Sequence, residues 1–269
     1  MRTMIALFLS SLLAGQEDGE FERRERKKAE AFQKKLEKDP DDAEANEAVG
    51  KFHCLVLGEW AKGLPFLEKG RDKELKALAT KELAADPKDA PSRISVADAW
   101  WTQSARLKGT EAKAARSHAA ALYRQGAAEA PKADRKRIVA RVNQQFAEAG
   151  ALVLKLPANV AWLDTGADLV VGETLKISAT GKWCLDANLE TGGVDQKGYQ
   201  KLFDKKCPHP TAFVMCLIFK VGESGKLAAA YKDCPYNVAS PGKLFIGCND
   251  FGPGDNTGEL TVTIERSMN

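Results

Sequence analysis

Apolar residues recur every three or four positions between residues 43 and 150, the spacing that places side chains on one face of a helix. Each apolar run stops at a glycine or a proline, and both residue types end helices. The pattern therefore predicts short helices arranged as antiparallel pairs, with breaks at Gly58, Gly70, Pro87, Gly109 and Pro131. One extra helix, from Leu75 to Leu83, is expected between two pairs.

From residue 151 the apolar spacing changes to every second position, which is typical of half-buried strands. Residues 151–156 predict a first strand or a tether that packs onto the sheets. About seven further short runs separated by turn residues favour a β-sandwich, and they are centred on 162, 169–171, 175–183, 213–220, 226–231, 244–248 and 260–264. The last two runs predict a β-hairpin.

The two patterns divide the 269 residues into two domains of the α+β class. We expect an all-α helical-repeat domain over 39–150, followed by an antiparallel β-sandwich over 151–269. Within the first, Asp39-Pro-Asp-Asp-Ala43 and Asp86-Pro-Lys-Asp-Ala90 introduce equivalent helices, and the domain resembles tetratricopeptide repeats. It also resembles N-terminal regions of uncharacterised exported bacterial proteins that carry Gly-Leu-Pro and Lys-Gly, as in the run 63–70.

The N-terminal residues 1–15 have one positive charge, an apolar centre and a small-residue end, which is typical of a secretory signal peptide. An uncleaved membrane anchor is the alternative. Gln16 stands where a lipoprotein would have cysteine, so we expect an exported protein, periplasmic or extracellular, with no stable membrane span after cleavage. Residues 16–38 form a densely charged arm.

The whole chain has a net charge of +3, and along its predicted helices positive and negative residues alternate, a pattern that does not favour a nucleic-acid partner. Five of the six cysteines lie after residue 180, and in an oxidising compartment they predict one or two disulfides in the β-domain. Cys248, on the apolar side of its strand, is the cysteine we expect to stay unpaired and buried.

The loop after residue 248 contains Asn249, Asp250, Asp255 and Asn256 among glycines that let the chain fold back on itself. Converging carboxylate and amide oxygens suit calcium, which takes six to eight such ligands. Asp and Asn are also common in any turn because they bond nearby backbone amides. The loop therefore predicts either a calcium site or an ordinary turn.

The run from Asn249-Asp250 through Asp255-Asn256-Thr257-Gly258 resembles the metal-binding loop of the calcium-dependent, galactose-binding bacterial lectins of the PA-I type. The runs 164–183 and 219–225 agree with this resemblance, which covers roughly residues 157–267. It implies a galactose-binding-like sandwich in which calcium is held by Asp250, Asp255 and Asn256 with the backbone carbonyl near Leu185. The nearby ligand-binding residues that follow from it are Asn249, Asp186, Asn188 and Thr257.

Other chemistries have weaker signals. Cys207 and His209 with Cys216 or Cys234 are candidate zinc ligands, yet the paired Cys-x-x-Cys spacing is missing. The sequence has no nucleophile-elbow, zinc-protease or phosphate-loop motif, so we expect no enzyme. His53 and His118 are expected to be structural. Of Trp100 and Trp101, one is expected in the core and the other half-exposed, unless the pair grips a peptide.

Two functions follow from these patterns. The first is an exported, non-catalytic protein whose sandwich binds a glycan or polysaccharide through calcium while the helices form a scaffold. The second is a metal-free interaction module of the cell envelope that binds a protein partner through its helical repeats.

Overall fold

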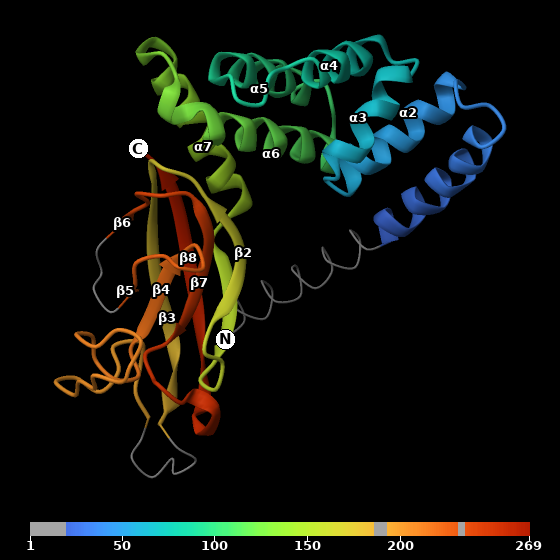
Figure 1. Ribbon diagram of the computed structural model, residues 1–269. Coiled ribbons are helices and arrows are strands. Elements are labelled where there is room, and N and C mark those ends of the chain that lie inside the picture. The colour runs from blue at the N-terminus through green and yellow to red at the C-terminus, as the bar shows by residue number, and fades with distance from the viewer. Residues whose placement is uncertain (1–19, 186–192, 231–234) are drawn as a thin grey trace, which may run out of the picture. The chain divides into compact units, whose positions relative to one another are not determined.

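The computed structural model describes residues 20–185, 193–230 and 235–269. A helical part precedes an antiparallel sheet part, which confirms the α+β class with two domains (Figure 1). The chain divides into two compact units, residues 1–130 and 131–269. The expected signal peptide, residues 1–15, lies outside the described residues. No helix within the described ranges is long and apolar enough to cross a bilayer.

The first unit begins with a helix over residues 20–36. The next elements are α2 (Ala43–Lys51), the π-helix η1 (Phe52–Val56), α3 (Trp60–Lys69), α4 (Lys73–Leu83), α5 (Ala90–Ser104), α6 (Gly109–Gly126) and the 3₁₀ turn η2 (Ala127–Glu129). Asp42 and Asp89, from the two Asp-Pro motifs, accept backbone N–H bonds as the N-caps of α2 and α5. The expected extra helix is α4.

Close helix packing in this unit depends on small residues. Gly50 of α2 lies against Leu67 of α3, where an added Cβ would meet the leucine side chain at 2.8 Å. Trp100 is fully buried and Trp101 is half-buried, which confirms the division of roles expected for the pair.

The second unit begins with α7 (Lys132–Ala149), which the sequence pattern alone grouped with the helical domain. Asn143 of α7 donates to the Met268 carbonyl at 2.9 Å and accepts from the Met268 N–H at 2.7 Å. The Arg266 guanidinium lies 4.9 Å from the centre of the Phe146 ring. These contacts with the last strand explain why the compact unit starts before residue 150.

The strands form two four-stranded antiparallel sheets. They are β1 (Leu152–Pro157), β2 (Leu163–Leu169), β3 (Glu173–Cys184), β4 (Leu217–Val221), β5 (Ala228–Ala229), β6 (Tyr236–Asn237), β7 (Gly242–Cys248) and β8 (Thr257–Met268). One sheet has the order β1-β8-β3-β6 and the other β2-β7-β4-β5. The run 151–156, expected to be a strand or a tether, therefore belongs to a true first strand.

One apolar core fills the space between the two sheets. Leu260, Val262 and Ile264 of β8 are buried at alternate positions, as the sequence predicts, and they share a cluster with Leu244 and Ile246 of β7. Residues of both sheets in one cluster identify the β-sandwich.

The expected hairpin between the last two strands is wrong. β7 pairs with β2 and β4, whereas β8 pairs with β1 and β3, so the intervening loop crosses from one sheet to the other. An apolar residue at every second position indicates that a strand has one buried face, but it does not indicate which strand lies beside it. A crossing of about 10 Å between packed sheets is within reach of the loop.

The expected disulfides do not form among the described cysteines. Cys54, Cys184, Cys207, Cys216 and Cys248 are all buried free thiols, and Cys234 lies outside the described residues. Cys248 is unpaired and buried as predicted, and its thiol donates to the Met215 sulfur at 3.3 Å.

Candidate functional site

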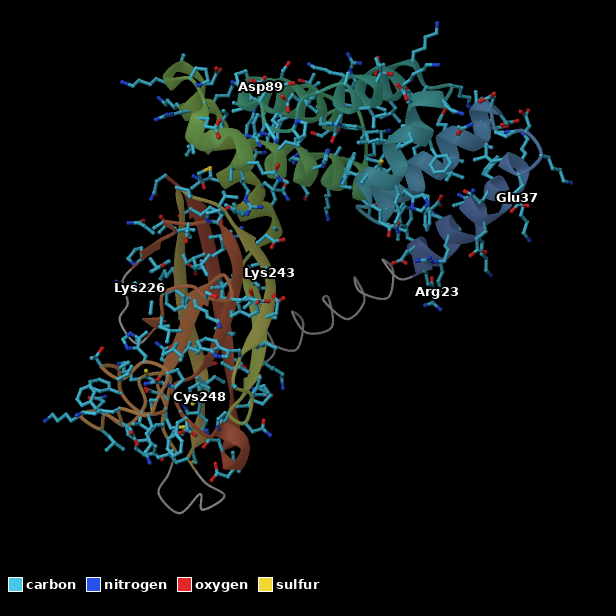
Figure 2. All side chains as sticks on the ribbon, viewed as in Figure 1. Arg23, Glu37, Asp89, Lys226, Lys243 and Cys248 are labelled. Atoms are coloured by element: carbon cyan, nitrogen blue, oxygen red, sulfur yellow. The ribbon has the colours of Figure 1, made fainter. Side chains whose placement is uncertain are left out.

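The loop between β7 and β8 lies at one end of the sandwich. Figure 2 marks Lys243 near the start of β7 and Cys248 at its end, where the chain enters the loop. The 3₁₀ turn η4 (Pro253–Asp255) lies in the middle of this loop. Asn249, Asp250 and Asn256 are buried, although polar side chains of loops usually face solvent. Their burial needs a partner for each polar atom.

Asn249 uses its amide to hold a neighbouring segment. Its Oδ1 accepts from the His209 N–H at 2.9 Å, and its Nδ2 donates to the carbonyls of His209 and Phe213, both at 3.1 Å. These bonds fix residues 209–213 against the start of the loop. The structure therefore gives Asn249, an expected ligand-binding residue, a structural part in the site.

Asp250 and Asn256 face one another across the loop. Nδ2 of Asn256 donates to Asp250 Oδ2 at 3.1 Å and to the Ala158 carbonyl at 3.3 Å. A flipped amide would instead turn its oxygen toward two acceptors, so the contacts fix the orientation. Asn256 is 4% exposed and Asp250 6% exposed. The sequence places both residues in the site, and the structure brings them together.

Asn256 Oδ1 is buried without a hydrogen-bond partner. Such an orphaned acceptor costs about 1–3 kcal/mol unless a donor or a cation satisfies it. The orphan belongs to a residue that already contacts the Asp250 carboxylate. Carboxylate and neutral amide oxygens are the hard ligands that calcium takes, so the chemistry of the two residues fits this ion, although the amide nitrogen and not Oδ1 contacts the carboxylate.

The other expected ligands have different positions. Asp255 is exposed at the end of η4, next to Asn256 in the chain. Thr257 opens β8 and pairs with Cys184, the last residue of β3. Leu185 follows Cys184 and Asn256 precedes Thr257, so the two residues flank the last pair of this ladder. Asp186 and Asn188 lie outside the described residues.

Backbone geometry also keeps β3 close to the start of β8. Gly258 has a φ of +92°, and a Cβ at this position would collide with the Lys182 carbonyl. Gly258 pairs with Trp183, which is fully buried. A larger residue at position 258 would move β8 away from the end of β3, and with it Asn256 away from Leu185.

The Asp250 carboxylate lies among buried thiols. Burial first, and the Asp250 charge next, raise the pKa of Cys207 and of Cys248. Both thiols therefore stay protonated near neutral pH, and thiolate ligands for a soft metal are not favoured.

The zinc reading fails for the described residues. Among them, no three His, Cys, Asp or Glu side chains gather closely enough to hold a metal ion. Cys207 belongs to the main sandwich core, whereas Cys216 packs with Ala212 and Ile218 in a separate cluster. A calcium site at the loop would thus depend on amide and carbonyl oxygens in addition to carboxylates.

The helical unit contains a polar cluster that the sequence does not predict. Glu82 of α4 accepts from Trp100 Nε1 at 2.6 Å and contacts His118 Nε2 at 2.8 Å. The His118 ring is stacked on Trp60 with 3.7 Å between centroids. His118 is structural, as expected, but its acidic partner is distant in sequence, and no local spacing could have identified it.

The same unit has a cavity of about 730 Å³. It lies between the helix over residues 20–36, α2, η1 and the start of α6, and Phe21, Phe32 and Phe52 contribute apolar surface. Its charged rim is internally paired, since Glu47 contacts Lys51 at 2.6 Å. This cavity is a candidate site for a partner of the helical unit.

Comparisons with known proteins identify no family for this chain. No protein-family model matches the sequence, and no curated protein matches it. Among solved structures, the chain is similar to one described as "EclA N-terminal domain; PllA-like lectin". The two are 22% identical, the match covers 43% of this chain and 96% of that chain, and the TM-score is 0.32.

Proposed function

We propose that this protein is an exported, non-catalytic glycan-binding protein whose sandwich binds sugar hydroxyls through calcium. The observation that carries the proposal is the buried, unpartnered Oδ1 of Asn256, whose amide nitrogen donates to the Asp250 carboxylate. Residues 249–258 also resemble the loop of calcium-dependent lectins, and this resemblance implies that Asp250 and Asn256 bind calcium.

Each residue has a distinct part in the proposed site. Asp250 provides a buried carboxylate, Asn256 provides its free amide oxygen, and Asp255 provides a second carboxylate from the exposed side of the loop. The backbone carbonyl of Leu185, the residue that follows Cys184 in the last β3–β8 pair, is the further oxygen that the proposal assigns to calcium. Calcium, when bound, offers open coordination positions to two neighbouring hydroxyl groups of a sugar.

The number of carboxylates sets the expected affinity. Ligand charge is one of the main determinants of calcium affinity, and two carboxylates place the site among weak sites, with a Kd of about 10⁻⁴–10⁻³ M. Such an affinity suits a calcium-rich exterior, in agreement with the export expected from residues 1–15.

Isothermal titration calorimetry with calcium, followed by a galactoside, tests this proposal. We expect calcium to bind the native protein, Asp250→Asn and Asp255→Ala to lower the affinity at least about tenfold, and sugar heat to require calcium. Glu265→Gln is the matched control. It removes the same negative charge, but from an exposed ion pair with Lys176. Absence of calcium binding to the native protein would reject the proposal.

The second candidate function is a protein-interaction module. The apolar cavity of the helical unit favours it, since aromatic surface within a helical repeat is suited to peptide segments. A native protein that binds no calcium but retains a peptide ligand, with Phe52→Ala abolishing that binding, would favour this function over the first.

A further inference from the structure

Apolar side chains are exposed beside the proposed calcium loop. Phe251 is 62% exposed, Phe203 53% and Leu202 47%, and they are among the most exposed large apolar residues of the described chain. We call Leu202, Phe203, Lys206 and Phe251 the aromatic rim. Exposed aromatic residues in one region of a surface commonly mark a binding site.

The aromatic rim packs against a segment that the loop holds in place. The Phe203 ring lies 5.2 Å from the Phe213 ring. Phe213 is in turn fixed by the bond from Asn249 to its carbonyl. Phe251 directly follows Asp250 in the chain, so the exposed ring and the proposed calcium ligand belong to one short segment.

The rim carries positive charge. Lys201, Lys205 and Lys206 are all exposed, and the Lys206 ammonium lies 5.5 Å from the centre of the Phe251 ring. Asp204 is the one acidic residue within 201–206, and its carboxylate accepts the Lys206 N–H at 2.8 Å. An anionic ligand therefore suits this surface better than a neutral one.

We propose that the aromatic rim selects acidic glycans, with a hexuronic acid stacked on Phe251 and its carboxylate bound by Lys206. This inference rests on the proposed calcium site, which would hold the hydroxyls of the same sugar. One face of a pyranose carries C–H groups that pack on an aromatic ring, while the carboxylate at C6 projects from the ring edge. The ammonium beside Phe251 is placed to meet such a carboxylate.

The test compares two sugars that differ only at C6, methyl galacturonide and methyl galactoside, by calorimetry in calcium. Monosaccharides are used because they do not form calcium gels. We expect the native protein to bind the uronide about threefold more tightly. Lys206→Gln should remove this preference, and Lys226→Gln, an exposed lysine at the β4–β5 turn marked in Figure 2, should keep it. Phe251→Ala should weaken the binding of both sugars about fivefold.

The outcomes separate the inference from the function on which it rests. Equal, calcium-dependent affinity for the two sugars would overturn the inference and leave the proposed function intact. Absence of binding to either sugar would overturn both. An anionic membrane is the competing occupant. Two results together would overturn the inference in favour of a membrane. The protein would bind phosphatidylserine vesicles without calcium and lose this binding in Phe251→Ala, and Lys206→Gln would leave the uronide preference unchanged.

Discussion

The amide of Asn256 donates a 3.1 Å hydrogen bond to the Asp250 carboxylate while its own oxygen stays buried and unpartnered. The pair joins the two ends of a loop that connects opposite sheets. An unsatisfied buried acceptor next to a buried carboxylate makes the pair a sensitive place for substitution.

Asn256→Asp should make stability dependent on calcium. The substitution places a second buried carboxylate beside Asp250 and removes two donated hydrogen bonds, so we expect a loss of about 3 kcal/mol without calcium. Added calcium should restore much of this loss, because it binds the folded state. Urea unfolding with and without calcium measures both effects.

Asn237→Asp is the control for that substitution, since Asn237 is exposed and should change stability by less than about 0.5 kcal/mol. If calcium stabilises Asn256→Asp no more than the native protein, Asn256 is not a ligand.

Asn249→Ala should destabilise the sandwich by about 3 kcal/mol, because the His209 N–H and the carbonyls of residues 209–213 lose their partner. Urea denaturation measures the loss, and limited proteolysis should show faster cleavage within 209–213. A residue that served only to contact ligand would leave the unfolding midpoint unchanged.

Glu82→Ala should destabilise the helical unit by about 3 kcal/mol, because Trp100 Nε1 and His118 Nε2 both lose an acceptor in a buried place. Glu82→Gln retains one acceptor and should lose less. The helical circular dichroism signal in urea reports the change. Glu74→Ala on the same helix, at an exposed pair with Arg106, is the control, and equal losses at positions 74 and 82 would contradict the structural part assigned to Glu82.

Alkaline pH should destabilise the protein through Cys216. Burial, followed by the nearby Cys207 thiol, raises the pKa of Cys216 to about 12, whereas an unfolded cysteine titrates near about 8.5. Between these values the unfolded chain has lost the proton that the folded chain keeps, so stability falls as pH rises and is fully present below about 8.5.

Cys216→Ala should therefore reduce the slope of unfolding free energy against pH by up to about 1.4 kcal/mol per pH unit in that window. Urea midpoints measured at several alkaline pH values give the slope. An unchanged slope would mean that Cys216 does not stay protonated in the folded state.

Local signals in the sequence predict much of the local structure. Asp42 and Asp89 cap the helices that they precede, because an N-cap needs only a carboxylate within reach of the next backbone amides. The alternation at Leu260, Val262 and Ile264 predicts a half-buried strand for the same kind of reason, since side-chain direction follows residue spacing.

Tertiary structure decided what no local spacing encodes. The partners of β7 and β8, the assignment of α7 to the sandwich unit through Asn143, and the contact between Glu82 and His118 all join residues distant in sequence. The sequence by itself determined the composition of the loop and thus its candidate ligands. Only the fold decided that the Asn249 amide is hydrogen-bonded to residues 209–213 while Asn256 keeps an unpartnered oxygen. Whether a polar atom finds a hydrogen-bond partner depends on which groups the packed chain brings within reach.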